Sequence, residues 1–176
     1  MNANRQTAAG VRLDVDGSGT AAVDTGLPVL DRLIVRLAEV ARFDLALEIQ
    51  PGDAEAEVVA AGNALGDALY APLRTPGVRG HGSGALTSAE ALAFVILEIS
   101  DTPLLVSNVD LTEARIGGLG TDVARRFLER FAEGAGITLH VRLLNGKDSQ
   151  HVLDAIFKAL GVALAGACSE KGAARE

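Results

Sequence analysis

One histidine and one carboxylate with the spacing of metal ligands stand at the predicted start of the last helix, in the stretch NGKDSQHVLDAIFKAL (145–160). His151 and Asp154 are three residues apart, so they lie on the same helical face. An imidazole and a carboxylate on one face are ligands that divalent metal ions use. Two side chains do not complete a coordination shell, and the residue before His151 is Gln150. The stretch is therefore compatible with a working metal site, the remnant of one, or an ordinary helix start.

The elements around this stretch predict a chain of mixed helices and strands. An apolar strand over 137–144 and a turn at Gly146 precede the last helix, which ends near Ala167. Residues 11–16 alternate in polarity and are followed by a Gly-Ser-Gly turn, which predicts a hairpin with one wet face. The same kinds of pattern predict further helices at 28–43, 54–73 and 121–136 and further strands at 44–50, 91–100 and 103–111.

The overall composition narrows the class of protein. Hydrophobic residues make up 48% of the 176 residues, which is enough for a sizeable core, and the formal net charge of −7 disfavours a general nucleic-acid binder. The single cysteine, Cys168, excludes an intrachain disulfide. The stretch MNANRQTAAG lacks the apolar core of a signal peptide, and no run of about 18 uncharged apolar residues occurs. We therefore expect a soluble cytoplasmic protein that binds neither nucleic acid nor membrane.

Two segments half a chain apart share one pattern. Residues 45–69 and 139–164 both run from a strand through a Gly-containing turn into a helix, and with one inserted residue the leucines of the two helices coincide. A duplication explains this pattern better than a solenoid, which needs at least about three shorter units. The predicted division is a single domain, 1–176, with repeats at about 8–75 and 82–168.

Seven short motifs are similar to those of a known enzyme family. In chain order they are DTGLPVLDRLI, FDLALEI, ALGDAL, GVRGHGS, EAL, AGITLHVRLLNGKD and HVLDAIFKAL. Together they resemble imidazoleglycerol-phosphate dehydratase of histidine biosynthesis, and the similarity is most specific from Gly134 to Leu160. The resemblance implies an α/β (α+β, two-layer) fold of the ribosomal protein S5 domain 2-like type, in which each repeat is a four-stranded sheet packed on two helices. It also implies trimers that associate into a 24-subunit shell, with manganese ions bound mostly by histidines between subunits.

The reaction of this family explains its need for histidines. The enzyme removes water from imidazoleglycerol phosphate, although the proton that leaves is on an unactivated carbon. Two metal ions hold the substrate's imidazole as an imidazolate, which stabilises the carbanion-like step. We therefore expect that a member without the metal ligands does not carry out this elimination.

Most positions that correspond to metal ligands of the family differ in this chain. Arg32 stands where the first helix of the family has a histidine, and Glu55 and Ala56 stand where its first repeat has a histidine pair. Arg32 and Glu55 are hypothesised to form an ion pair in the former metal pocket. No cofactor is expected from what remains, and manganese only if the reduced set still forms a site. The retained metal-type residues are His140, His151 and Asp154.

The phosphate-binding positions of the family are kept in part. Gly80 and Thr102 stand where the family has arginines, whereas its C-terminal Ser-x-Lys-Gly motif is present as residues 169–172. The histidine of RGHGSG is interpreted as a surface-loop residue, and both Gly-rich segments as turns or loops rather than phosphate cradles. The candidates for substrate binding are Lys147, Ser169 and Lys171.

We interpret the chain as a diverged member of the family that lacks the metal-dependent dehydratase activity and has a binding or scaffold role. Two enzymatic alternatives remain. The chain is an imidazoleglycerol-phosphate dehydratase, or its pocket has been converted to another lyase or isomerase reaction. The expected partners are further copies in a trimer rather than a 24-mer, an authentic dehydratase homologue, and a small phosphorylated ligand. The candidate acid–base residues are Glu90, His140, His151 and Asp154.

Overall fold

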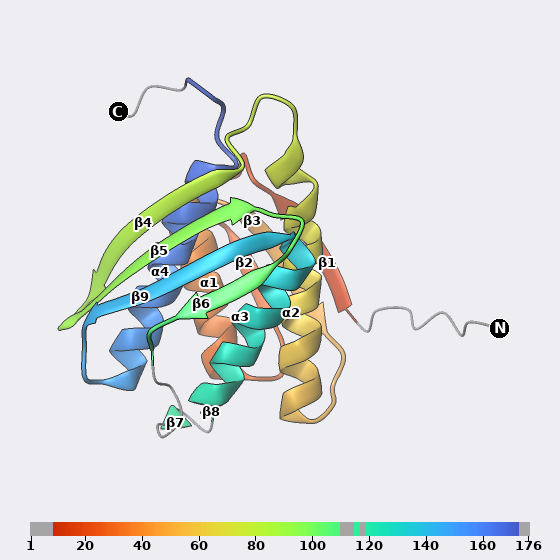
Figure 1. Ribbon diagram of the computed structural model, residues 1–176. Coiled ribbons are helices and arrows are strands. Elements are labelled where there is room, and N and C mark those ends of the chain that lie inside the picture. The colour runs from red at the N-terminus through yellow and green to blue at the C-terminus, as the bar shows by residue number, and fades with distance from the viewer. Residues whose placement is uncertain (1–8, 110–114, 117–118, 173–176) are drawn as a thin grey trace.

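The computed structural model of the chain describes residues 9–109, 115–116 and 119–172. Four long helices lie between two sheets in this part of the chain, and Figure 1 shows the second sheet in front of the helices. Helices α1 and α2 pack on the first sheet (β1, β2 and β3), and α3 and α4 pack on the second (β4, β5, β6 and β9). Between the sheets, α2 contacts α3 and α1 contacts α4. The predicted mixed α/β fold is confirmed. The helices are α1 (Pro28–Ala41), α2 (Ala54–Tyr70), α3 (Thr121–Ala135) and α4 (Ser149–Ala167), with a short 3₁₀ turn at Pro72–Arg74.

The strands form a three-stranded sheet in the order β1-β3-β2, a four-stranded sheet in the order β4-β5-β9-β6, and a short pair β7-β8. In chain order they are β1 (Ala9–Asp14), β2 (Ala21–Asp24), β3 (Asp44–Ile49), β4 (His81–Ser88), β5 (Ala91–Ile99), β6 (Leu104–Ser107), β7 (Arg115–Ile116), β8 (Leu119–Gly120) and β9 (Ile137–Asn145).

One arrangement of strands and helices occurs twice. Strand β3 lies between antiparallel β1 and parallel β2, and β9 lies between antiparallel β5 and parallel β6. A helix precedes each central strand and another follows it. This matching order supports the two-repeat division, which stays a prediction. The described residues of the first sheet have three strands where four were expected, and β4 has no counterpart among them.

The predicted hairpin at residues 11–25 is wrong, because β1 and β2 pair with β3 and not with each other. The carboxylate of Asp44, at the start of β3, accepts the backbone N–H groups of Ser18, Gly19 and Thr20. These bonds hold the β1–β2 connection at the start of β3, so that β1 and β2 lie on opposite sides of that strand. Alternating polarity identifies the buried face of a strand but not its neighbour, which explains the error.

The starts of α2 and α4 correspond to each other residue by residue. Asp53 caps α2 by accepting the N–H of Ala56, and Asp148 caps α4 by accepting the N–H groups of Gln150 and His151. An aspartate at this position satisfies N–H groups that have no partner within the helix. Counted from these caps, Ala56 occupies the place of His151, as the sequence comparison of the two halves predicted.

Helix α4 is buried along most of its length, between the second sheet and α1. None of the described helices is long and apolar enough to span a membrane.

Replacing Gly161 with alanine is expected to destabilise the protein by about 1–3 kcal/mol, because the new methyl group would lie 2.6 Å from the carbonyl oxygen of Leu37 in α1. Gly166→Ala in the same helix is the matched control. Its methyl group would meet Gly82 at 3.7 Å, an ordinary contact. The control should gain roughly 0.5–1 kcal/mol from helix propensity. Urea unfolding of both variants measures the difference, and equal stabilities would contradict the expected clash.

Candidate functional site

A carboxylate–imidazole pair joins the turn between β4 and β5 to the start of α4. Glu90 follows Ala89, whose left-handed backbone (φ 48°) turns the chain between the two strands. Its Oε2 atom lies 2.6 Å from Nδ1 of His151, and its Oε1 atom accepts the N–H groups of Asp148 and Lys147 at 2.8 and 3.2 Å. The structure therefore brings together two of the four predicted acid–base residues, from segments that are far apart in the sequence.

These contacts shift the pKa of both side chains. The N–H of Asp148, with further hydrogen bonds from His151 and Lys147, lowers the pKa of Glu90 to about 2. The hydrogen bond to Glu90 raises the pKa of His151, and the negative charges of Asp148 and Asp154 act in the same direction. Both side chains are 41% exposed, so water screens much of the interaction between their charges.

Glu90→Gln is expected to make stability less dependent on pH. Because the folded-state pKa of Glu90 is lowered from 4.5, its contribution is present above about pH 4.5 and is lost as the pH falls toward 2. Because the folded-state pKa of His151 is raised from 6.5, its contribution is present below that pH and is lost above it. The stability difference between wild type and variant should therefore be largest at about pH 4.5–6.5.

Thermal unfolding between pH 2 and 9 measures this dependence. Glu129→Gln is the control, since Glu129 is 45% exposed and pairs with Arg125 on one helix. A difference between wild type and Glu90→Gln that does not change with pH would show that the pair contributes no charge-dependent stability.

The other two predicted acid–base residues lie elsewhere. Asp154 faces α1, where its Oδ1 atom is 3.6 Å from Nε of Arg36. His140 is exposed on β9 and stands opposite Ile96 of β5, whereas its neighbours on β9 are buried toward the helices. The sheet therefore lies between His140 and α4. The three predicted metal ligands, His140, His151 and Asp154, are not brought to one point within the chain.

The residues at the helix starts do not fit a manganese site. Manganese prefers several oxygen or imidazole donors, but Ala56 has none, and the carboxylate of Glu55 pairs with Arg126 of α3. Within the described part of the chain, no three His, Cys, Asp or Glu side chains lie close enough to hold a metal ion. His151 alone resembles a metal-bound histidine, because a carboxylate holds its second ring nitrogen.

The hypothesised ion pair between Arg32 and Glu55 is also wrong. Glu55 pairs with Arg126, and no ion pair between Glu55 and Arg32 is formed in the described part of the chain. The packing explains this outcome. Helix α2 packs against α3, which carries Arg126, whereas Arg32 is on the exposed side of α1.

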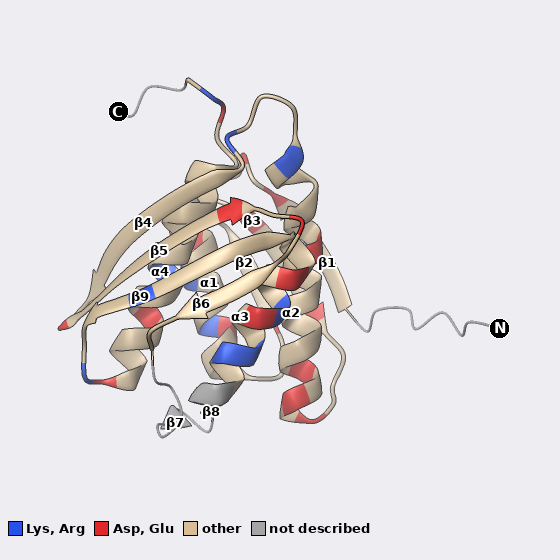
Figure 2. Cartoon of the chain, in the orientation of Figure 1, with Lys and Arg blue, Asp and Glu red and all other residues tan. Residues whose placement is uncertain are grey.

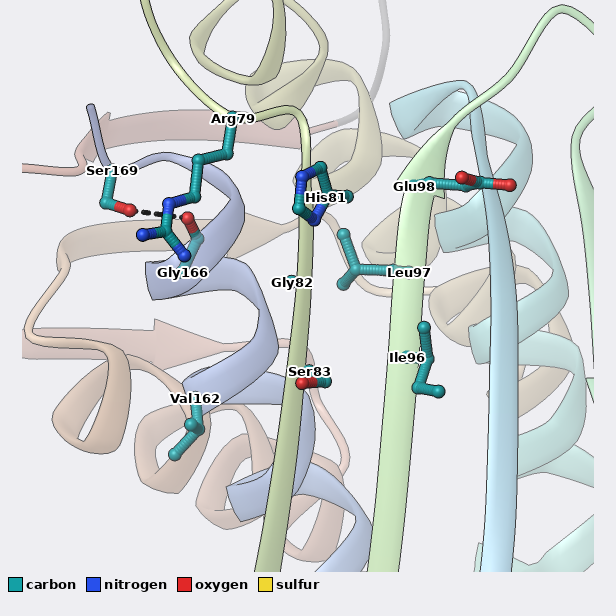
Figure 3. A pocket seen from close by; sticks show the side chains of 10 residues that line it. All are labelled: Arg79, His81, Gly82, Ser83, Ile96, Leu97, Glu98, Val162, Gly166 and Ser169. Atoms are coloured by element: carbon teal, nitrogen blue, oxygen red, sulfur yellow. Dashed lines mark hydrogen bonds between the residues drawn. The ribbon is translucent and has the colours of Figure 1, made fainter. Parts of the chain in front are cut away.

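A hollow of about 680 Å³ surrounds the first residues of β4 and the end of α4. In Figure 3 the side chain of Arg79 reaches toward Ser169 and Gly166 at the end of that helix, whereas the carboxylate of Glu98 points the other way. The Ser169 hydroxyl donates to the carbonyl oxygen of Gly166 at 2.6 Å. No carboxylate lies within 4 Å of Arg79 in the described chain. A guanidinium and a hydroxyl on one side of a hollow can bind an anion.

The C-terminal segment is tied to the start of β4 by backbone hydrogen bonds. The N–H of Arg79 donates to Ser169, and the N–H of Lys171 donates to Gly77. The structure thus places two of the predicted substrate-binding residues, Ser169 and Lys171, beside Arg79. Lys147 is not part of this group. It precedes the first residue of the 19-residue helix α4, whose far end lies about 27 Å away.

Sequence reasoning missed Arg79 and misplaced His81. Arg79 stands one residue before Gly80, which occupies the place of an arginine in the family, and this displaced arginine was the available signal. His81 is the first residue of β4 and lines the hollow, so it is not a loop residue. Neither fact follows from the sequence pattern, because only the chain fold brings residues 79–81 to residue 169.

Comparison with known proteins decides the family. The family model described as imidazoleglycerol-phosphate dehydratase matches residues 25–164. The chain belongs to the imidazoleglycerol-phosphate dehydratase family. The dehydratase of Desulfitobacterium hafniense is 36% identical over 165 residues, which cover 91% of this chain and 84% of that protein. The dehydratase of Aromatoleum aromaticum is 39% identical over 158 residues, which cover 87% of this chain and 80% of that protein.

Solved structures of dehydratases share the fold. The Staphylococcus aureus enzyme superposes with a TM-score of 0.85 at 24% identity, covering 96% of both chains. The Pyrococcus furiosus enzyme superposes with a TM-score of 0.82 at 24% identity, covering 93% of this chain and 90% of that one. The expected fold of the dehydratase family is therefore confirmed for this chain.

Proposed function

We propose that this chain serves histidine biosynthesis in the cytoplasm as an imidazoleglycerol-phosphate dehydratase. The observation that supports this proposal is the extent of the similarity. Relatives that carry this name match 80% or more of their own length at 36–39% identity. The reaction class is the removal of water from a phosphorylated imidazole compound.

Complementation tests this proposal directly. A strain that lacks its own dehydratase and requires histidine should grow without histidine when it expresses this chain. The purified protein should release water from imidazoleglycerol phosphate. Failure of both measurements with folded protein would exclude dehydratase activity.

A second candidate is a diverged member that binds the family's ligand without metal-dependent dehydration. Three observations support it. Ala56 supplies no donor atom, Glu55 pairs with Arg126, and Asp154 faces Arg36. Under this proposal the protein binds imidazoleglycerol phosphate, leaves it unchanged, and contains no stoichiometric manganese. Binding without turnover is the result that separates this candidate from the first.

For both candidates we propose that Arg79, Ser169 and Lys171 hold the phosphate group of the ligand. Arg79 offers a planar group of donors, and Lys171 adds positive charge on the segment that is tied to Gly77. The hydroxyl of Ser169 would turn from the carbonyl oxygen of Gly166 to donate to the phosphate. The acidic chain as a whole would repel a phosphate, so a local group of cations is needed to bind one. Lys147 lies at the other end of α4, beside His151, and is proposed to contact the part of the ligand that lies there.

We further propose that the chain works as an oligomer, with a trimer as the smallest form. One small ligand cannot reach both ends of α4, so a site that uses His151 together with Ser169 needs two copies of the chain. The strands of the second sheet contain few charged residues, as their mostly tan colour in Figure 2 shows, and they expose the side chains of Ile96, Leu104 and Leu144. Light scattering of the purified protein measures the mass, and a monomer at micromolar concentration would contradict this proposal.

A further inference from the structure

We propose that Glu90 is a positioning residue that keeps the proton of neutral His151 on Nδ1 and so leaves Nε2 free to accept a hydrogen bond from a ligand. Both carboxylate oxygens are engaged. Oε1 accepts two backbone N–H groups, and Oε2 contacts the imidazole at 2.6 Å. The position of the proton follows from this geometry alone, and only the identity of the ligand rests on the proposed function.

The position of the proton follows from the donors and acceptors around Glu90. Two backbone N–H groups donate to Oε1 of this carboxylate and stabilise its ionised form, in which Oε2 is an acceptor with no proton to give. A neutral imidazole has one N–H group and one lone pair. Nδ1 must carry the N–H group, because a lone pair would repel the carboxylate oxygen that it faces. The remaining lone pair is on Nε2.

Both residues are held by regular structure. The N–H of His151 is fixed by the cap residue Asp148, and the next two residues, Val152 and Leu153, are buried in the core. Glu90 lies in a two-residue turn between paired strands. Groups that are carried by the ends of strands and helices keep their geometry better than groups on long loops. Because the His151 side chain is 41% exposed, a ligand can reach it from solvent.

A lone pair on Nε2 selects ligands that offer an O–H or N–H group. Imidazoleglycerol phosphate, the ligand of the proposed function, has hydroxyl groups and an imidazole. With the opposite tautomer a ligand that is held with its O–H or N–H group toward Nε2 would meet a second donor there, and it would have to turn an acceptor toward His151 before it could bond. Glu90 thus acts on ligand choice through His151, without contact of its own with the ligand.

The test is nitrogen-15 NMR of the full-length protein at a pH where His151 is neutral. The wild type should show the proton on Nδ1. In Glu90→Gln the single side-chain oxygen should stay with the two backbone N–H groups, and the amide NH₂ should then face Nδ1. The amide donates to that nitrogen, so the proton should move to Nε2. Glu129→Gln, an exposed carboxylate on α3, should leave the wild-type spectrum of His151 unchanged.

The binding measurement uses imidazoleglycerol phosphate and calorimetry. Glu90→Gln should weaken binding by about tenfold, the effect of one lost hydrogen bond, and Glu129→Gln should not. A wild-type proton on Nε2, the same tautomer in wild type and Glu90→Gln, or equal affinities would each overturn the proposal. If the wild type does not bind this compound, the proposed function fails. The NMR spectrum of the wild type still shows which nitrogen of His151 carries the proton, so it tests the present proposal independently of that result. The same wild-type spectrum tests the position of the proton if Glu90→Gln does not fold.

Discussion

Gly82→Ala is expected to destabilise the protein by about 3 kcal/mol or more, which would lower the melting temperature by roughly 6–12 °C. A methyl group on Gly82 would collide with the carbonyl oxygen of Ala163 and approach the nitrogen of Ala167 in α4. These neighbours are helix backbone, so no side chain can rotate to make room. Strand β4 would have to move away from α4, and the hollow that contains Arg79 and Ser169 would lose its shape.

A matched control is available in the first sheet. Gly10 also lies within a strand, but a methyl group there would meet no atom within 4 Å. Gly10→Ala should therefore change the stability by no more than about 0.5 kcal/mol. Thermal and urea unfolding of the two variants measure the effect. Equal melting temperatures for Gly82→Ala and Gly10→Ala would refute the close packing of β4 on α4.

Arg79→Gln is expected to weaken the binding of imidazoleglycerol phosphate about 10- to 100-fold. A hydrogen bond between a charged donor and a phosphate contributes about 1.5–3 kcal/mol. The hollow beside Arg79 is lined by two neutral hydroxyls, those of Ser83 and Ser169, and no ion pair joins Arg79 to a carboxylate among the described residues. Arg79→Lys should restore part of the affinity, since lysine keeps the charge but not the planar group of donors.

Arg125→Gln controls for the loss of one positive charge. Arg125 is 60% exposed on α3 and pairs with Glu129, away from the hollow. Isothermal calorimetry of the three variants measures the affinities, and a circular dichroism spectrum verifies that each is folded. If Arg79→Gln bound the compound as tightly as Arg125→Gln, the phosphate group would not be held at this end of α4.

Much of the fold could be predicted because its signals are local. Apolar residues at helical spacing identified α1 to α4 to within a few residues. The likeness of the two halves identified which positions correspond. The pairing of strands was not local. A hairpin was predicted for β1 and β2, yet the carboxylate of Asp44 holds their connection at the start of β3, and the two strands pair with opposite sides of β3.

The candidate site was predicted less well than the fold. Glu90 and His151 were both identified as chemically interesting residues, but their contact joins two turns that are far apart in the sequence. His140 and His151 were grouped because both resemble family ligands, whereas the sheet lies between them. Lys147 and Ser169 were grouped as substrate-binding residues, whereas α4 holds them at its opposite ends.

The amino-acid sequence by itself determined the family, the helices and the absence of an imidazole at Arg32 and Ala56, because these depend on residue type and on short-range periodicity. Only the tertiary structure decided which side chains meet. It paired Glu90 with His151, placed Arg79 beside Ser169, and joined Glu55 to Arg126. The physical reason is that a contact between distant segments depends on how whole strands and helices pack, and residue spacing along the chain does not contain that information.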